Sequence, residues 1–264
     1  MLYPCLCCGY LTLTEKPPGT YLICPICCWE DSLTDDEPGS NDVSRRYAQR
    51  NFIAFGACER EWLSYVRSPS STDQRDPNWQ TIDAQADAAS LHLIQQIIKA
   101  FDGVTRDDGV SLHEARAIDD YEGESGRAAA RQKDTESRWQ DVPVQWLEEF
   151  SDVFHFFDAK GFRYYLPAYM IWAIKNYQIT KSNSLDMMIY SLDVYEDKKY
   201  PDYDPYHRFR LFNEEQVKAV ASFLRFMATY GRDWIDAGAA DRALQKYWQR
   251  TLTLNPSTKK GEGL

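Results

Sequence analysis

The sequence lacks any apolar run of the roughly 18–20 residues that a membrane-spanning helix needs. Its first five residues hold neither the basic stretch nor the apolar stretch that begins a signal peptide. We therefore expect a cytoplasmic protein that does not enter a membrane. Because thiols stay reduced in that compartment, the cysteines indicate a metal site rather than disulfide bonds.

Positive charge is also scarce. The chain of 264 residues carries 40 acidic and 30 basic side chains, a net charge of −10, and its longest basic runs are the pairs Arg45-Arg46 and Lys198-Lys199. Such a surface repels nucleic-acid phosphates, so we do not expect a nucleic acid as partner. A basic protein fits it better, although acidity also serves solubility alone.

Sequence signatures of catalysis are missing as well. There is no phosphate-binding loop, dinucleotide fingerprint, nucleophile elbow or zinc-protease helix. None of the four histidines lies in the His-x-Glu context of a zinc deaminase. They are His92, His113, His155 and His207. We therefore expect a protein that is not an enzyme.

Cysteine, in contrast, is concentrated at the start of the chain. Six of the seven cysteines lie within the first 28 residues, and four of them form two C-x-x-C pairs separated by 15 residues. Two thiolates at this spacing can curl around one side of a zinc ion, and four complete its tetrahedron. Because four sulfurs leave no open position for water, we predict a structural Zn²⁺. Its predicted ligands are Cys5, Cys8, Cys24 and Cys27.

The other three cysteines leave an alternative open. Cys7 and Cys28 each follow or precede a predicted ligand directly, so either could replace it in a shifted register. The spacing favours the first assignment, because neighbouring Cys7 and Cys8 would crowd the metal. Cys58 lies in an apolar run and is expected to be a small buried residue.

The residues between the two pairs are typical of a β-hairpin. Tyr10–Thr14 and Thr20–Ile23 have the composition of strands, and Pro17-Pro18-Gly19 supplies a turn between them. Gly9, directly after the second predicted ligand, permits a tight turn. We therefore predict a small zinc-ribbon-like β module.

This part of the chain resembles the bacterial cysteine-rich CPCC domain family. The segments that carry the resemblance are Tyr3–Leu13, Ile23–Asp31, Asn51–Phe52, Phe55–Glu59 and Val66–Trp79. It covers roughly residues 1–79 and implies a small zinc-ribbon-like module without an assigned activity. Leu6 stands where the family name implies proline, and Cys28 where an aromatic residue is more usual, but neither is a predicted ligand.

After the polar stretch at residues 68–78 the pattern becomes helical. Ala86–Phe101 predicts an amphipathic helix with Leu91, Ile94, Ile98 and Phe101 on its buried face. A second apolar face extends over Val144–Phe157 and is expected to end at Gly161, where the chain turns. Residues 106–136 are polar and interrupted by glycines, and they predict an ordered loop flanking a flexible excursion near residues 123–134.

Further helices are predicted toward the end of the chain. Leu166–Tyr177 is apolar enough to be buried, with Pro167 in its first turn. A short helix begins at Ser184 or Asp186, and another begins at Asn213, whose side chain forms a capping box with Gln216. Gly231 should end that helix, and the last helix covers residues 241–250.

The segment Phe157–Met170, with the motif GFRYYLPAYM, resembles a second, uncharacterised bacterial family of helical domains. The resemblance covers roughly residues 95–250 and implies no activity. The expected fold class is therefore α+β, a small zinc-ribbon-like β module followed by a mainly α-helical domain. The expected domains are residues 1–79 and 85–252, and residues 253–264 form a disordered tail.

One segment combines carboxylates with tyrosines, which offer rigid contact area at low entropic cost, and we expect it to bind a protein. Its residues are Asp193, Tyr195, Glu196, Asp197, Tyr200, Asp202, Tyr203, Asp204 and Tyr206. Such a surface could cover the basic active site of a toxin domain encoded by a neighbouring gene. The leading hypothesis is thus an immunity protein, and a plain surface loop remains the alternative reading of the segment.

Two other functions remain open. An enzyme could use a pocket around His155, Asp158 and Arg163 with the tyrosines that follow, or the acidic group Asp119, Asp120, Glu122 and Glu124 could bind a divalent cation. A zinc ribbon could bind nucleic acid through Arg45, Arg46 and Arg50. We rank this last because the same small module contains Glu30, Asp31, Asp35, Asp36 and Glu37.

Overall fold

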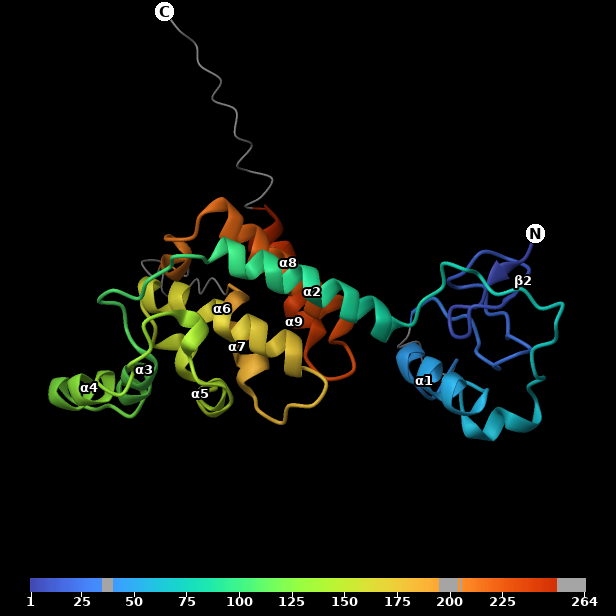
Figure 1. The fold of residues 1–264 in the computed structure, drawn as a ribbon, viewed down its shortest axis with the longest axis horizontal. Coiled ribbons are helices and arrows are strands. Elements are labelled where there is room, and N and C mark those ends of the chain that lie inside the picture. Colours follow the sequence, from blue (N-terminus) through green and yellow to red (C-terminus); the bar gives the residue numbers. More distant parts are fainter. Residues whose placement is uncertain (35–39, 195–203, 205, 251–264) are drawn as a thin grey trace, which may run out of the picture. The chain divides into compact units, whose positions relative to one another are not determined.

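The computed structural model describes residues 1–34, 40–194, 204 and 206–250. A small two-stranded sheet at the N-terminus is followed by a mainly helical chain (Figure 1), which confirms the expected α+β class. The chain divides into two compact units, Met1–Ala88 and Ala89–Leu264, here named the cysteine unit and the helical unit. The tail predicted at residues 253–264 lies outside the described residues.

The sheet of the cysteine unit pairs other segments than expected. Strand β1 (Tyr3–Pro4) is antiparallel to β2 (Leu11–Leu13), whereas Ile23 forms a bridge with Glu30. The predicted pairing of residues 10–14 with 20–23 is therefore wrong. The residues on either side of each C-x-x-C turn pair with each other. Their backbone N–H and C=O groups are then no longer available for pairing between residues 10–14 and 20–23.

Helix α1 (Arg45–Phe55) and the 3₁₀ helix η1 (Arg60–Ser64) complete the ordered elements of the cysteine unit before α2 (Ile82–Ala100) begins. The small core of this unit contains most of the cysteines together with Ile26, Trp29 and Ala48. A core this small buries little apolar surface, and domains of this size are usually stabilised by disulfides or metal ions in addition.

The helical unit is formed mainly by helices that follow α2. Among the described residues, seven of them are α-helices and four are shorter turns of 3₁₀ or π type. The α-helices are α3 (Leu112–Asp119), α4 (Glu124–Arg131), α5 (Val144–Glu149), α6 (Ala159–Asn176), α7 (Ser184–Leu192), α8 (Glu214–Tyr230) and α9 (Ala237–Ala243). The shorter turns are η2 (Trp139–Asp141), η3 (Val153–His155), η4 (His207–Phe209) and the π-helical η5 (Leu244–Trp248).

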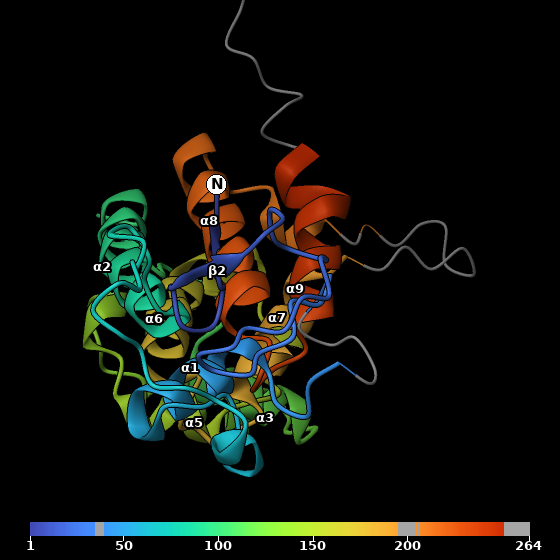
Figure 2. The same cartoon turned by 90° about the vertical axis from the view of Figure 1, so that its right-hand side faces the viewer.

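Helix α6 forms the centre of the helical unit. In both views it lies between α5 on one side and α8 on the other (Figures 1 and 2). Its tyrosine Tyr169 is fully buried, contacts Phe154 ring to ring at 4.7 Å, and donates its hydroxyl to the backbone oxygen of Phe150 at 2.7 Å. Aromatic residues therefore supply much of the core.

The start of α6 corrects two predictions. Gly161 does not end the preceding element but lies in the first turn of α6, and Pro167 lies inside this helix rather than in its first turn. Asp158 caps the helix, accepting hydrogen bonds from the backbone N–H groups of Gly161 at 2.8 Å and Val110 at 2.9 Å. A Cβ on Gly161 would lie 2.3 Å from the backbone oxygen of Val110, so glycine serves close packing here, not chain reversal.

The polar segment at residues 106–136 is also more regular than expected. Residues 123–134 contain α4, which packs against α3, instead of a flexible excursion. Glu114 of α3 accepts hydrogen bonds from Arg131 at 2.7 Å and Arg127 at 3.2 Å, both on α4. Ion pairs across the two helices thus replace the apolar contacts whose absence made the segment look disordered.

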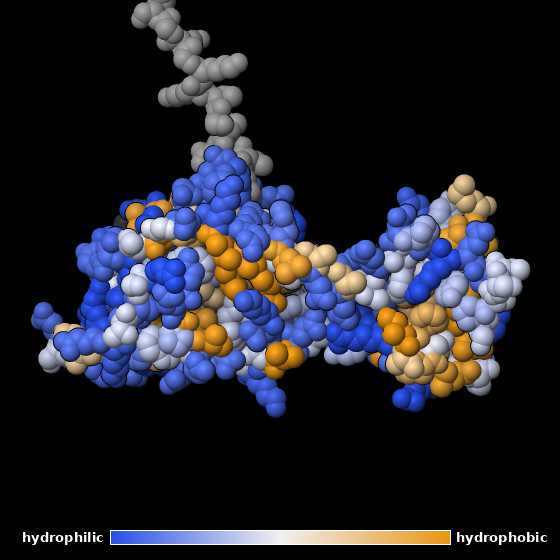
Figure 3. Space-filling view, viewed as in Figure 1, coloured by the Kyte–Doolittle hydropathy of each residue, from blue (hydrophilic) through white to orange (hydrophobic). Residues whose placement is uncertain are grey.

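Helix α2 was predicted correctly, but only part of its buried face was. Phe101 is buried and Ile94 packs against the core, as predicted. Leu91 and Ile98 are 70% and 36% exposed instead, and Leu93 and Ile97 are buried in their place. Figure 3 shows the resulting strip of hydrophobic surface along α2. Apolar residues lie both on the face that contains Leu91 and Ile98 and on the face that contains Leu93 and Ile97. Periodicity alone therefore could not decide which face is buried.

The remaining helices agree better with the sequence. Asn213 and Gln216 form the predicted capping box of α8, and the helix ends directly before Gly231. The segment 144–157, in contrast, is split into α5 and η3, and the last helical stretch begins at Ala237 rather than at residue 241. None of the helices in the described part of the chain has the length and apolarity needed to cross a bilayer.

Candidate metal centre

The first C-x-x-C turn is held by two backbone hydrogen bonds. The N–H of Cys5 donates to the oxygen of Tyr10 at 2.9 Å, and the N–H of Gly9 donates to the oxygen of Cys5 at 2.8 Å. Gly9 has a φ of +79°, a left-handed conformation that glycine adopts without steric cost. The turn therefore directs the side chains of Cys5 and Cys8 to the same side.

The second turn repeats this pattern. The N–H of Cys24 donates to the oxygen of Trp29 at 2.9 Å, and the N–H of Cys28 donates to the oxygen of Cys24 at 2.8 Å. Cys28 takes the place that Gly9 has in the first turn and is also left-handed, with a φ of +64°. A residue with a Cβ adopts this conformation at a cost of roughly 1–2 kcal/mol. Two turns of the same geometry thus face each other.

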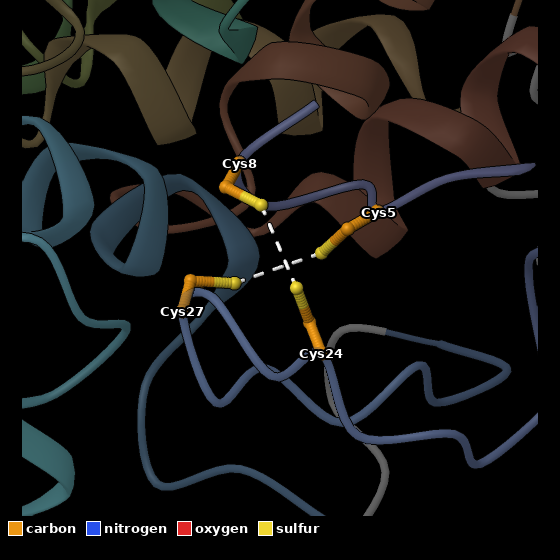
Figure 4. A group of neighbouring side chains, drawn as sticks. All are labelled: Cys5, Cys8, Cys24 and Cys27. Atoms are coloured by element: carbon orange, nitrogen blue, oxygen red, sulfur yellow. Dashed lines mark hydrogen bonds between the residues drawn. The ribbon is translucent and has the colours of Figure 1, made fainter. Parts of the chain in front are cut away.

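The four thiols of these turns converge on one point (Figure 4). Their sulfur atoms all lie within 4.8 Å of one another, and the pairs Cys5–Cys27 and Cys8–Cys24 are each 3.6 Å apart. Sulfurs bound to zinc at about 2.3 Å in a tetrahedron lie about 3.8 Å apart. All four residues are fully buried. The cluster can therefore hold a metal ion, and its size fits tetrahedral thiolate coordination.

The thiols perturb one another strongly. Hydrogen bonds from Cys27, Cys5 and Cys8 lower the pKa of Cys24, and Thr12 adds a hydroxyl donor at 3.2 Å from its sulfur. The hydrogen bond with Cys24 is the main cause that raises the pKa of Cys8, and desolvation is the main cause for Cys27. Four thiolates this close repel one another, so a cation is needed before all can be deprotonated.

The remaining cysteines lie around this cluster. Cys7 is buried and Cys28 is half-buried. Cys58 is buried, as expected, and its N–H donates to the backbone oxygen of Cys27 at 2.6 Å. Desolvation, followed by the charge of Cys7, raises the pKa of the Cys58 thiol. We therefore assign Cys58 a supporting role through its backbone.

Three side chains that sequence reasoning missed cover the first turn. Gln49 donates to the backbone oxygen of Leu6 at 2.9 Å, and the indole N–H of Trp79 donates to the same oxygen at 3.2 Å. Arg75 donates to the backbone oxygen of Cys8 at 2.8 Å and lies over the Trp79 ring at 4.3 Å. These side chains donate hydrogen bonds to carbonyl groups of the turn that have no partner within the turn itself. No local sequence pattern indicates that they do so.

The three side chains considered for an enzyme pocket make separate contacts. Asp158 caps α6, Arg163 donates to the backbone oxygen of Leu211 at 3.0 Å, and no hydrogen bond or ion pair among the described residues links either of them to His155. Desolvation, and then the charge of Arg208, lowers the pKa of His155. Asp158 and Arg163 thus have structural roles.

The predicted basic face is largely neutralised. Arg46 is buried and lies 3.1 Å from Asp83, and Arg50 pairs with the same carboxylate at 2.7 Å. Both therefore stabilise the contact between α1 and the start of α2. The acidic group Asp119, Asp120, Glu122 and Glu124 does not gather three ligand atoms at one point in the described part of the chain.

The predicted partner-binding segment is described only at its ends. Asp193, Asp204 and Tyr206 have defined positions, and the other predicted residues lie outside the described residues. Asp193 forms ion pairs with Lys246 at 3.0 Å and Arg242 at 3.4 Å. The ends of the segment therefore have contacts within the fold.

Comparisons with known proteins agree with the division into two parts. The model of the cysteine-rich CPCC family matches residues 3–73. The model of a family of unknown function, DUF6714, matches residues 89–252. No curated protein and no solved structure matches the chain. Because the second match covers more than half of the sequence, the chain belongs to the DUF6714 family and carries a cysteine-rich CPCC domain in front of it.

Proposed function

We propose that the four thiols hold one structural Zn²⁺ and that the chain is a non-enzymatic protein-binding protein, more narrowly an immunity protein that inhibits a bacterial toxin domain. The metal proposal is supported by the spacing and burial of the four sulfurs. Four thiolate ligands complete the coordination of zinc, so the ion would contribute to folding and not to a reaction.

The binding proposal is carried by how the acidic, tyrosine-containing segment is anchored. At one end Asp193 pairs with Lys246, and at the other the Tyr206 ring stacks on Tyr247 with centroids 5.0 Å apart. Because Lys246 and Tyr247 are neighbours in η5, both ends are held at one place. Holding the described ends of a binding surface in place lowers the entropy that is lost on association.

The expected target follows from charge. Residues 193–206 contribute five carboxylates and four tyrosines, and the whole chain has a net charge of −10. A toxin that acts on nucleic acid needs a basic active site, which such a surface complements. Blocking that site would require no chemistry from the inhibitor.

The zinc proposal is tested by the metal content of the purified full-length protein. We expect one zinc per chain, none in Cys24→Ser, and one in the matched control Cys58→Ser, which changes a buried cysteine outside the cluster. The helical circular dichroism signal should largely persist in Cys24→Ser because the helical unit has its own core. A metal-free wild-type protein, or full zinc content in Cys24→Ser, would contradict the proposal.

The binding proposal is tested by co-expression with the protein encoded by the neighbouring gene. We expect the full-length chain to co-purify with that protein and to rescue growth from its toxicity. Replacing Tyr200 and Tyr203 by alanine should abolish both effects. Tyr121→Ala, which removes a tyrosine that is 96% exposed elsewhere, should not. Neither co-purification nor rescue by the wild-type chain would refute the immunity function.

A further inference from the structure

The segment after α1 exposes large apolar side chains on the cysteine unit. Trp62 is 38% exposed, Leu63 44% and Tyr65 73%, and the rings of Trp62 and Tyr65 meet edge to face at 5.7 Å. Figure 3 shows hydrophobic residues gathered over α1 and η1. Tryptophan and tyrosine exposed side by side are typical of surfaces that bind another protein.

A cavity of about 400 Å³ opens beside this segment. Its lining residues are Val43, Asn51, Phe55, Glu59, Arg60 and Glu61. The guanidinium of Arg60 lies over the Phe55 ring, 4.8 Å from its centroid. The cavity thus combines an aromatic wall with carboxylates at its edge.

Three carboxylates gather at this cavity. One oxygen from each of Asp42, Glu59 and Glu61 lies within 4.8 Å of the others. Glu59 accepts hydrogen bonds from the Asp42 backbone and the Trp62 side chain. Desolvation, with smaller contributions from the charges of Asp42 and Glu61, raises the pKa of Glu59. A cation placed among these groups would relieve their mutual repulsion.

We infer that Trp62, Leu63, Tyr65 and the acidic cavity, together named the η1 surface, dock a protein segment that carries arginine or lysine beside an apolar side chain. The cation would enter among the three carboxylates, and the apolar side chain would cover Trp62 and Tyr65. A bound metal ion alone would leave these aromatic residues exposed. The inference goes beyond the proposed function, because it concerns another surface and does not require the partner to be a toxin.

A pair of synthetic hexapeptides tests this inference on the full-length protein. One alternates leucine with arginine and the other alternates leucine with glutamate. The readout is the indole N–H resonance of Trp62 in protein labelled with ¹⁵N-tryptophan, assigned with Trp62→Phe. We expect the arginine peptide to shift this resonance saturably and the glutamate peptide to leave it in place. Equal shifts with both peptides, or none with the arginine peptide, would overturn the inference.

Matched variants distinguish the effect of the local carboxylates on peptide binding from the effect of the net charge of the protein. Glu59→Gln combined with Glu61→Gln should weaken binding of the arginine peptide by at least about tenfold. The control, Glu148→Gln combined with Glu149→Gln, removes the same charge from exposed residues of α5 and should leave binding unchanged. Equal weakening in both variants would refute a specific site. A shift caused by Ca²⁺ but not by the arginine peptide would make the three carboxylates a metal site instead.

Discussion

Replacing Gly9 by alanine should destabilise the cysteine unit by about 3 kcal/mol. The left-handed backbone at this position, φ +79°, costs a residue with a Cβ roughly 1–2 kcal/mol. In addition, the new Cβ would lie 2.6 Å from Cγ of Trp79. The indole ring must therefore move, which weakens its hydrogen bond to Leu6 and its contact with Arg75, together worth about 1–2 kcal/mol.

Gly56→Ala provides the matched control. Gly56 follows α1 with a φ of +91°, and a Cβ there would meet no atom within 4 Å, so only the backbone cost of roughly 1–2 kcal/mol applies. Hydrogen exchange followed by mass spectrometry measures the opening of each unit separately. Peptides from the cysteine unit should lose more protection in Gly9→Ala than in Gly56→Ala, by about tenfold or more. Equal losses in the two variants would refute the conflict with Trp79.

Three further predictions concern the helical unit. Asp158→Ala should lower the free energy of unfolding by about 1–2 kcal/mol in thermal denaturation, and Asp158→Asn by less, because asparagine keeps an acceptor for the N–H of Gly161. Desolvation opposes the ionised form of Glu114. The hydrogen bonds from Arg131, the Ser111 backbone and Arg127 outweigh this effect and lower the pKa of Glu114 below 4.5. This stabilisation is present above pH 4.5 and is lost as the pH falls through the lowered pKa, so Glu114→Gln should flatten the acid side of a stability–pH curve. Tyr169→Phe leaves a buried carbonyl without its donor and should cost about 1–2 kcal/mol in urea unfolding, whereas an unchanged midpoint would argue against that hydrogen bond.

Local patterns in the sequence were sufficient for the thiol cluster. The two C-x-x-C pairs predicted which four of seven cysteines converge, because two residues between thiols are enough to close one turn of backbone. The capping box of Asn213 and Gln216 was predicted for the same reason, since both partners lie within one helical turn. Features of this kind need no information from distant parts of the chain.

Other features depended on contacts between distant residues. The strand pairing in the cysteine unit was predicted wrongly. The residues directly beside each cysteine turn pair with each other, and this pairing competes with the longer hairpin for the same backbone groups. The role of Gly161 was missed because its reason, the close approach of Val110, lies 51 residues earlier in the chain. Trp79, which covers the turn formed by the first cysteines, had no local signal either.

The sequence by itself determined the zinc-type cysteine spacing, the division into a cysteine-rich part and a helical part, and most of the helices, because these depend on composition, periodicity and neighbours a few residues apart. Only the tertiary structure decided which face of α2 is buried, that ion pairs between Glu114 and the arginines of α4 order a polar segment, and that three carboxylates meet beside Trp62. Burial and charge pairing are properties of the groups that surround a residue in space, and the order of residues along the chain specifies them only through the complete fold.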